Sequence, residues 1–139
     1  MNDVQESVTR AAKGLASSFP ILIGVMLLVS LMDVLIPLSF YERAFTGNIF
    51  SDSFIGSLIG SVLAGNPMTS YVMGGEFLSQ GVSMVAVAAF LVAWVTVGVI
   101  NIPAESMMLG RRFTIVRNIN AFILSIVIAI LTVLVVGLL

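Results

Sequence analysis

Residues 54–79, FIGSLIGSVLAGNPMTSYVMGGEFLS, decide how this chain is folded. The stretch is apolar enough for one membrane-spanning helix, but Gly65-Asn66-Pro67 interrupts it in the middle. A helix over 54–65 reaches only about 18 Å, at about 1.5 Å per residue, against a hydrocarbon core of about 30 Å. We therefore predict a re-entrant hairpin of two half-length helices, whose irregular turn must be buried in protein or line a wet cavity.

The composition of the whole chain indicates that it is surrounded by lipid. Of 139 residues, 59% are apolar and 9% are charged, whereas a soluble domain carries about 25% charged residues. Lipid must therefore contact most of the surface, and we expect an all-α integral membrane protein with one membrane domain over 1–139. The chain has no Cys and no His, so we expect no enzyme, no metal site and no cofactor. The net charge of −1 argues against a nucleic-acid partner.

The remaining segments divide into an interfacial helix, three full spans and two loops. Residues 1–16 carry Val4, Val8, Ala11 and Leu15 at helical spacing, which predicts an amphipathic helix in the membrane interface, with a frayed tail as the alternative. We expect Pro20 at the start of the first span and Pro37 near its end. The predicted spans are 19–40, 82–102 and 118–139, and the predicted loops are Tyr41–Ser53 and Ala104–Arg117.

The distribution of basic residues favours the hairpin over a fourth span. With a hairpin, one side of the membrane holds Arg10, Lys13, Arg111, Arg112 and Arg117, and the other side holds Arg43 alone. If 54–75 spanned instead, the three later arginines would join Arg43 on the outer side. Because short cytoplasmic loops concentrate Lys and Arg, we predict a multi-pass protein of the cell membrane with a cytoplasmic N-terminus and an external C-terminus.

The tip of the hairpin is the first candidate binding site. A re-entrant tip exposes free N–H groups and free carbonyls at membrane depth, an arrangement that transporters use to hold substrates or ions. Asn66, Pro67, Thr69 and Ser70 shape this tip, and three of them add polar side chains. The alternative is an ordinary helix start with proline in its first turn and with Thr and Ser as local caps.

Other polar or small residues stand out in the apolar segments. Asp33 lies about 6 Å from the midplane of the first span, so it is a candidate ion or proton site, or a carboxylate that reaches interfacial water or Arg43. Asn101, before Pro103, is a weaker candidate and could mark a local unwinding. Glu105 and Glu76 are expected as interfacial caps or as partners of Arg111 and Arg112. Gly56, Gly60 and Ala64 form a row of small residues that lets another helix approach closely.

The stretch from the hairpin through VSMVAVAAFLVAWVTVGVINIPAESMMLGRR resembles a known pattern. It is similar to the nucleoside-recognition (Gate) domain membrane proteins and to related predicted permeases that include the arsenical permeases. Gly81, Val87, Phe90, Leu91 and Pro103 occupy matching places, and the resemblance covers about 54–135. It implies a transporter built from two such units, and this chain is about half the size of such a transporter. Some arsenical permeases carry cysteines that have no counterpart here.

These observations lead us to expect a half-size permease subunit that moves a small polar solute or ion. Three passes are too few to enclose a pathway, so the chain must associate. We expect a parallel homo-oligomer, or an oppositely oriented paralogue that would restore an inverted repeat. The row of small residues is the expected contact face. The alternative is a non-transporting scaffold or assembly subunit, and an intramembrane enzyme is a more distant third possibility.

Overall fold

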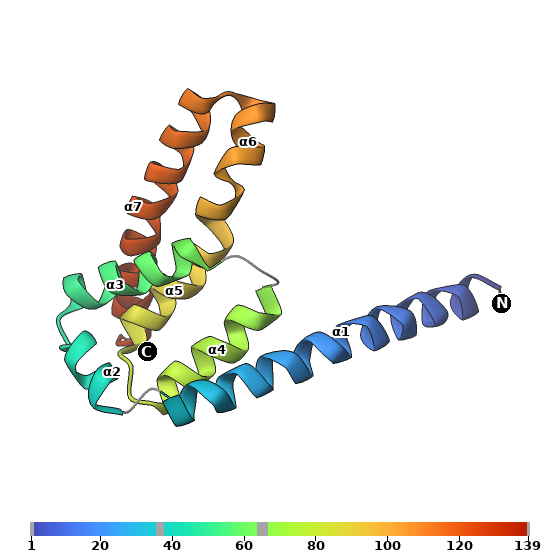
Figure 1. Cartoon of the computed structure of the whole chain (residues 1–139), viewed down its shortest axis with the longest axis horizontal. Helices are drawn as coiled ribbons and strands as arrows, with labels where there is room; N and C mark the ends of the chain where they lie inside the picture. The colour runs from blue at the N-terminus through green and yellow to red at the C-terminus, as the bar shows by residue number, and fades with distance from the viewer. Residues whose placement is uncertain (1, 36–37, 64–66, 139) are drawn as a thin grey trace. The chain divides into compact units, whose positions relative to one another are not determined.

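The structure is a computed structural model that describes residues 2–35, 38–63 and 67–138, all of whose regular elements are helices. It contains two compact units, Met1–Ile36 and Pro37–Leu139, which are considered separately. The second unit holds α2 (Leu38–Ala44), α3 (Ile49–Val62), α4 (Pro67–Ser79), α5 (Met84–Thr96), the 3₁₀ turn η1 (Val99–Asn101), α6 (Ile102–Leu109) and α7 (Arg111–Val136). Figure 1 labels these helices.

The first unit is a single helix, α1, over Asn2–Leu35. We predicted an interfacial helix followed by a separate span starting at Pro20, but the helix is continuous and Pro20 lies inside it. A proline inside a helix removes one backbone hydrogen bond and can kink the helix without ending it, and α1 continues past this position. The expected end of the span at Pro37 falls outside the described residues, as does the side chain of Asp33.

Two helices of half length replace the single helix that hydropathy alone would suggest. α3 has 14 residues and α4 has 13, so each reaches only about 20 Å, too short to cross a hydrocarbon core. α3 ends at Val62, and α4 begins at Pro67, where the missing N–H of proline costs nothing. Within the predicted turn, Ala64, Gly65 and Asn66 lie outside the described residues.

Two later stretches are long and apolar enough to cross a bilayer. Within the described residues these are Met84–Leu109 and Arg111–Val136, each of 26 residues; the second is the continuous helix α7, which is about 39 Å long. Their length and composition suggest that the chain associates with a membrane. The predicted loop over Ala104–Arg117 is instead helical on both sides of Gly110, whose φ of 86° is accessible to glycine and reverses the chain. The last helix consequently begins at Arg111 and not at residue 118.

The interior of the second unit combines the apolar side chains of α5, such as Phe90 and Trp94, with small and polar residues of α3 and α7, while many large apolar side chains of the other helices are exposed. α5 is central and packs against α3, α4 and α7; its crossing with α3 is visible in Figure 1. On α7, Thr114, Asn118, Ser125 and Ala129 are buried at helical spacing, whereas Ile115, Ile119 and Leu124 are exposed. This pattern is the reverse of that in a soluble bundle, and it is typical of helices that pack through small residues within lipid. On α3 the buried residues are Asp52, Ser53, Gly56, Ser57, Gly60 and Ser61.

Candidate functional site

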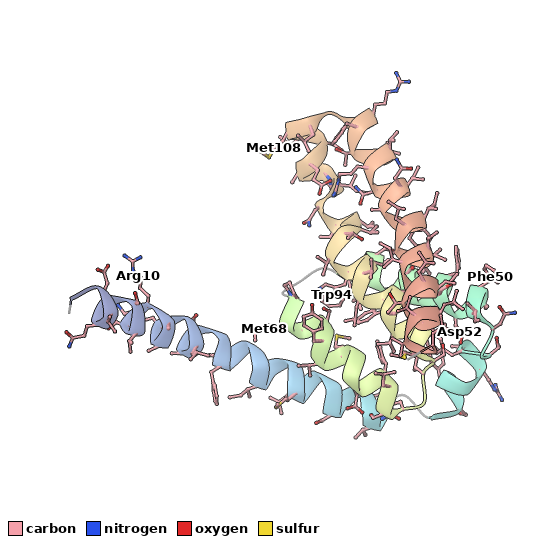
Figure 2. The ribbon with its side chains drawn as sticks, turned by 180° about the vertical axis from the view of Figure 1, so that it is seen from behind. Arg10, Phe50, Asp52, Met68, Trp94 and Met108 are labelled. Atoms are coloured by element: carbon pink, nitrogen blue, oxygen red, sulfur yellow. The ribbon has the colours of Figure 1, made fainter. Side chains whose placement is uncertain are left out.

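A polar cavity of about 200 Å³ lies where the two interrupted segments of the second unit meet. Pro67, the first residue of α4, forms one wall. The end of α5 and the turn that follows it form another, with Asn101, Glu105 and Arg117 contributing polar side chains. Figure 2 shows Trp94 of α5 together with Met68, the neighbour of Pro67. The full lining is Pro67, Trp94, Val95, Thr96, Val97, Gly98, Asn101, Glu105 and Arg117.

The interruption of α5 creates the second wall. We predicted an unbroken span over 82–102, but α5 ends at Thr96 and Val97 takes an extended conformation with φ −103° and ψ 117°. The three residues Val95, Thr96 and Val97 are β-branched, and Gly98 follows them, so this short run favours the helix weakly. Pro103 adds a second obstacle because its ring would clash with the carbonyl of Val99 in a continuous helix.

Asn118 of α7 stabilises the interrupted backbone. Its Oδ1 accepts a hydrogen bond of 3.0 Å from the N–H of Gly98, which has left the ladder of α5. Its Nδ2 donates to the carbonyl of Thr114 at 3.0 Å and to Oε2 of Glu105 at 3.4 Å. The Asn118 side chain is buried, with 7% of the residue exposed, so these bonds replace partners that water cannot supply.

An ion pair between α6 and α7 forms the polar end of the cavity. Nη2 of Arg117 donates to both carboxylate oxygens of Glu105, at 2.7 Å for Oε2. We predicted that Glu105 is an interfacial cap or a partner of Arg111 and Arg112; Glu105 lies in the first turn of α6, and its partner is Arg117 instead of either of those arginines. Because α7 begins at Arg111, helical spacing places Arg117 beside Thr114 and Asn118 on the inner face, while Arg111 and Arg112 are exposed.

The sequence-predicted site residues are only partly brought together. Pro67 and Asn101 line the same cavity, and Asn101 lies in the 3₁₀ turn where the backbone departs from the α-helix. Thr69 and Ser70 are not among the lining residues, and the Ser70 hydroxyl donates to the carbonyl of Pro67 at 2.7 Å. That bond turns the hydroxyl back onto the backbone of the first turn of α4, so it is neither a contact with the cavity nor a helix cap. Asn66 and the Asp33 side chain lie outside the described residues.

The row of small residues on α3 faces α5 of the same chain. An alanine Cβ at Gly56 would stand 2.1 Å from the carbonyl oxygen of Ala86, and one at Gly60 would stand 2.3 Å from that of Phe90. Both positions therefore require glycine because of close backbone approach. The face that we expected to contact another subunit is consequently occupied within the chain, and Ala64 lies outside the described residues.

Asp52 is a buried carboxylate that we did not predict, because we placed residues 41–53 in an extramembrane loop. Asp52 lies in the first turn of α3 and is 0% exposed (labelled in Figure 2). It accepts hydrogen bonds from the N–H groups of Thr46 at 3.1 Å and Gly47 at 3.2 Å, and from the Ser83 hydroxyl at 2.6 Å. These bonds fasten the start of α3 to the start of α5.

Glu105, Arg117 and Asn118 were likewise not predicted as one cluster. The available signal was Gly110, since a reversal at this glycine brings the residues before and after it side by side. No group of three acidic side chains that could hold a metal ion occurs in the described ranges. Compared with protein-family models, with curated proteins and with solved structures, the chain shows no match.

Proposed function

We propose that this chain is a membrane permease subunit that binds a small polar solute or ion in the cavity between α4 and the interruption of α5. The observation that carries the proposal is the meeting of two interrupted helical segments at one polar cavity. Transporters build their substrate sites from discontinuous helices, because the exposed backbone groups at helix ends bind polar solutes. Irregular backbone at membrane depth is otherwise avoided.

The position of the cavity along the candidate span supports a role in transport. Val97 and Gly98 lie at the middle of Met84–Leu109, and substrate sites of such transporters lie near the bilayer midplane. Glu105 and Arg117 lie toward the end of the two spans that the loop at Gly110 joins. The cavity therefore runs from the midplane toward one membrane surface, where a charged pair tolerates contact with water.

The proposal includes the topology predicted from the basic residues and an association of subunits. The N-terminus is cytoplasmic, the segment around α3 and α4 enters and leaves on the outer side, and Gly110 is cytoplasmic. Three passes and a hairpin do not surround a solute pathway, so several copies, or one copy and an oppositely oriented partner, enclose it. Because α5 occupies the glycine face of α3, the exposed faces of α7 and α1 supply the contact between subunits.

An uptake experiment tests the function. The purified chain is reconstituted into proteoliposomes and screened with labelled amino acids, organic acids, amines, nucleosides and inorganic ions. We expect one class to accumulate, and we expect Glu105→Gln and Arg117→Gln to reduce its uptake by at least about tenfold, with Arg112→Gln as the matched control at an exposed arginine. Absence of uptake for every class, or uptake that both cavity variants leave unchanged, would support the scaffold alternative.

Cysteine labelling tests the topology separately. The chain contains no cysteine, so single substitutions need no background removal. Ser51, Leu78 and Leu109 are exposed, so a cysteine at each position is accessible to a reagent. We expect an impermeant thiol reagent to label Ser51→Cys and Leu78→Cys from outside, and Leu109→Cys from the cytoplasm. Labelling of Leu78→Cys only from the cytoplasm would exclude the hairpin.

A further inference from the structure

The cavity presents one positive and one negative group to a solute. The side chains of Arg117 and Glu105 are 36% and 24% exposed, so both are reachable although they contact each other. Both carboxylate oxygens bind the same guanidinium nitrogen, Nη2. Within the described part of the chain Nη1 and Nε make no hydrogen bond, and Nε is buried. Because Nη2 is occupied by Glu105 and the buried Nε cannot reach a solute, Nη1 is the donor that remains for a charge-assisted hydrogen bond to a second carboxylate.

The opposite wall is rich in acceptors. α5 ends at Thr96, so the carbonyls of Val95 and Thr96 lack the N–H four residues later that a continuing helix would offer. The 3₁₀ turn and Asn118 use the nearby N–H groups instead: Asn101 donates to Gly98, and Gly98 donates to Asn118. These carbonyls form the negative end of a 13-residue helix and, together with Glu105, attract a cationic group.

From this arrangement we infer that the cavity binds a small zwitterion of the amino-acid class, with its carboxylate on Arg117 and its ammonium on Glu105 and the end of α5. A solute with only a negative charge is attracted by Arg117 but repelled by Glu105 and by the α5 carbonyls. A solute with only a positive charge is attracted by Glu105 and by the α5 carbonyls but repelled by Arg117. A zwitterion aligned antiparallel to the ion pair is attracted at both ends.

The size of the cavity limits the zwitterion further. A volume of about 200 Å³ is below the range of about 300–1,000 Å³ that is usual for drug-sized ligands. It suits a solute of a few non-hydrogen atoms, such as a small α-amino acid, and it is small for a nucleoside. This inference rests on the proposed function only in taking the cavity as the solute site.

The test compares L-alanine with its two singly charged parts, propionate and ethylamine, on the full chain in lipid nanodiscs by titration calorimetry. We expect L-alanine to bind at least about tenfold more tightly than either part, because only alanine satisfies both walls. Propionate or ethylamine binding as tightly as alanine would overturn the inference, as would the absence of alanine binding to the unmodified chain.

Two variants separate binding from folding. Arg117→Gln is expected to abolish binding of alanine and propionate, whereas Glu105→Gln is expected to weaken alanine but to strengthen propionate, because it removes a repulsive carboxylate and frees Arg117. A purely structural role for the pair would weaken both ligands in both variants and would refute the assignment. Arg112→Gln should bind all three ligands as the unmodified chain does. Alanine binding without uptake would refute the transport proposal alone, and uptake of another class without alanine binding would refute only this inference.

Discussion

Replacing Gly56 with alanine tests the contact on which the fold depends, the packing of α3 on α5. A Cβ at this position would lie 2.1 Å from the carbonyl oxygen of Ala86, whereas real Cβ atoms essentially never approach within 3.0 Å. The two helices must therefore separate by about 1 Å, since the opposing atom belongs to the backbone and has no rotamer to change. Gly60 meets the same obstacle at 2.3 Å, from the carbonyl of Phe90.

The magnitude follows from two opposing terms. Overpacking a tight interface costs about 1–3 kcal/mol, and a clash with rigid backbone belongs at the upper end of that range. Alanine recovers up to about 1 kcal/mol over glycine through its helix propensity. We therefore expect Gly56→Ala and Gly60→Ala each to lower the free energy of unfolding by about 2 kcal/mol.

Two other glycines in α4 complete a graded series. A Cβ added at Gly75 would have nothing within 4 Å of it, so Gly75→Ala should gain up to about 1 kcal/mol from propensity alone. A Cβ at Gly74 would meet Cγ1 of Val87 at 3.2 Å, a side chain that can shift, and the Gly74→Ala variant should fall between the others. Unfolding in mixed micelles with increasing SDS, followed by circular dichroism, measures the series. A Gly56→Ala variant as stable as Gly75→Ala would refute the packing of α3 on α5.

Three further predictions concern buried polar groups, each measured by the same unfolding assay. Asp52→Ala removes the acceptor of two backbone N–H groups and one hydroxyl; Thr46 and Gly47 are exposed, so water replaces the carboxylate at their N–H groups, and we expect a loss of about 1–2 kcal/mol. Ser51→Ala, at the exposed neighbouring position, should change stability by less than about 0.5 kcal/mol, and equal effects would contradict the role of the carboxylate. The hydroxyls of Ser57 and Ser125 are 2.8 Å apart, and a double-mutant cycle with alanine should give a coupling of about 0.6 kcal/mol, the average for hydrogen bonds between membrane helices; a coupling of zero would exclude the bond. Asn118→Leu removes the acceptor for the N–H group that follows α5, so it should lower stability by about 2 kcal/mol and speed hydrogen exchange at that amide, while unchanged exchange would contradict the capping role.

Local chemistry made the separation of α3 from α4 predictable. A Gly-Asn-Pro sequence in an apolar stretch favours a helix boundary, because proline lacks the N–H, its ring disfavours the helical conformation of the preceding residue, and glycine and asparagine are weak helix formers. The structure accordingly separates α3 from α4 and begins α4 at Pro67. The close approach at Gly56 and Gly60 likewise follows from their spacing, although the spacing does not say which helix approaches.

The interruption of α5 was missed because it depends on a distant residue. Val95, Thr96 and Val97 resemble any apolar helix in hydropathy, and a window average does not detect their weak helix preference. The extended backbone at Val97 persists because Asn118, 20 residues after Gly98, accepts the hydrogen bond that the helix has lost. A partner at that separation becomes visible only when α7 is placed beside α5.

Composition and local breakers alone determined that this chain is helical, that it has helices long and apolar enough to cross a membrane, and that the stretch over 54–79 is interrupted at its centre. The tertiary structure decided that α5 is interrupted as well, that Glu105 pairs with Arg117, and that both interruptions meet at one cavity. The physical reason is the range of the forces involved. Helix breaking acts within one turn of the chain, whereas the hydrogen bonds and the ion pair that form the cavity join helices whose packing no short stretch of sequence specifies.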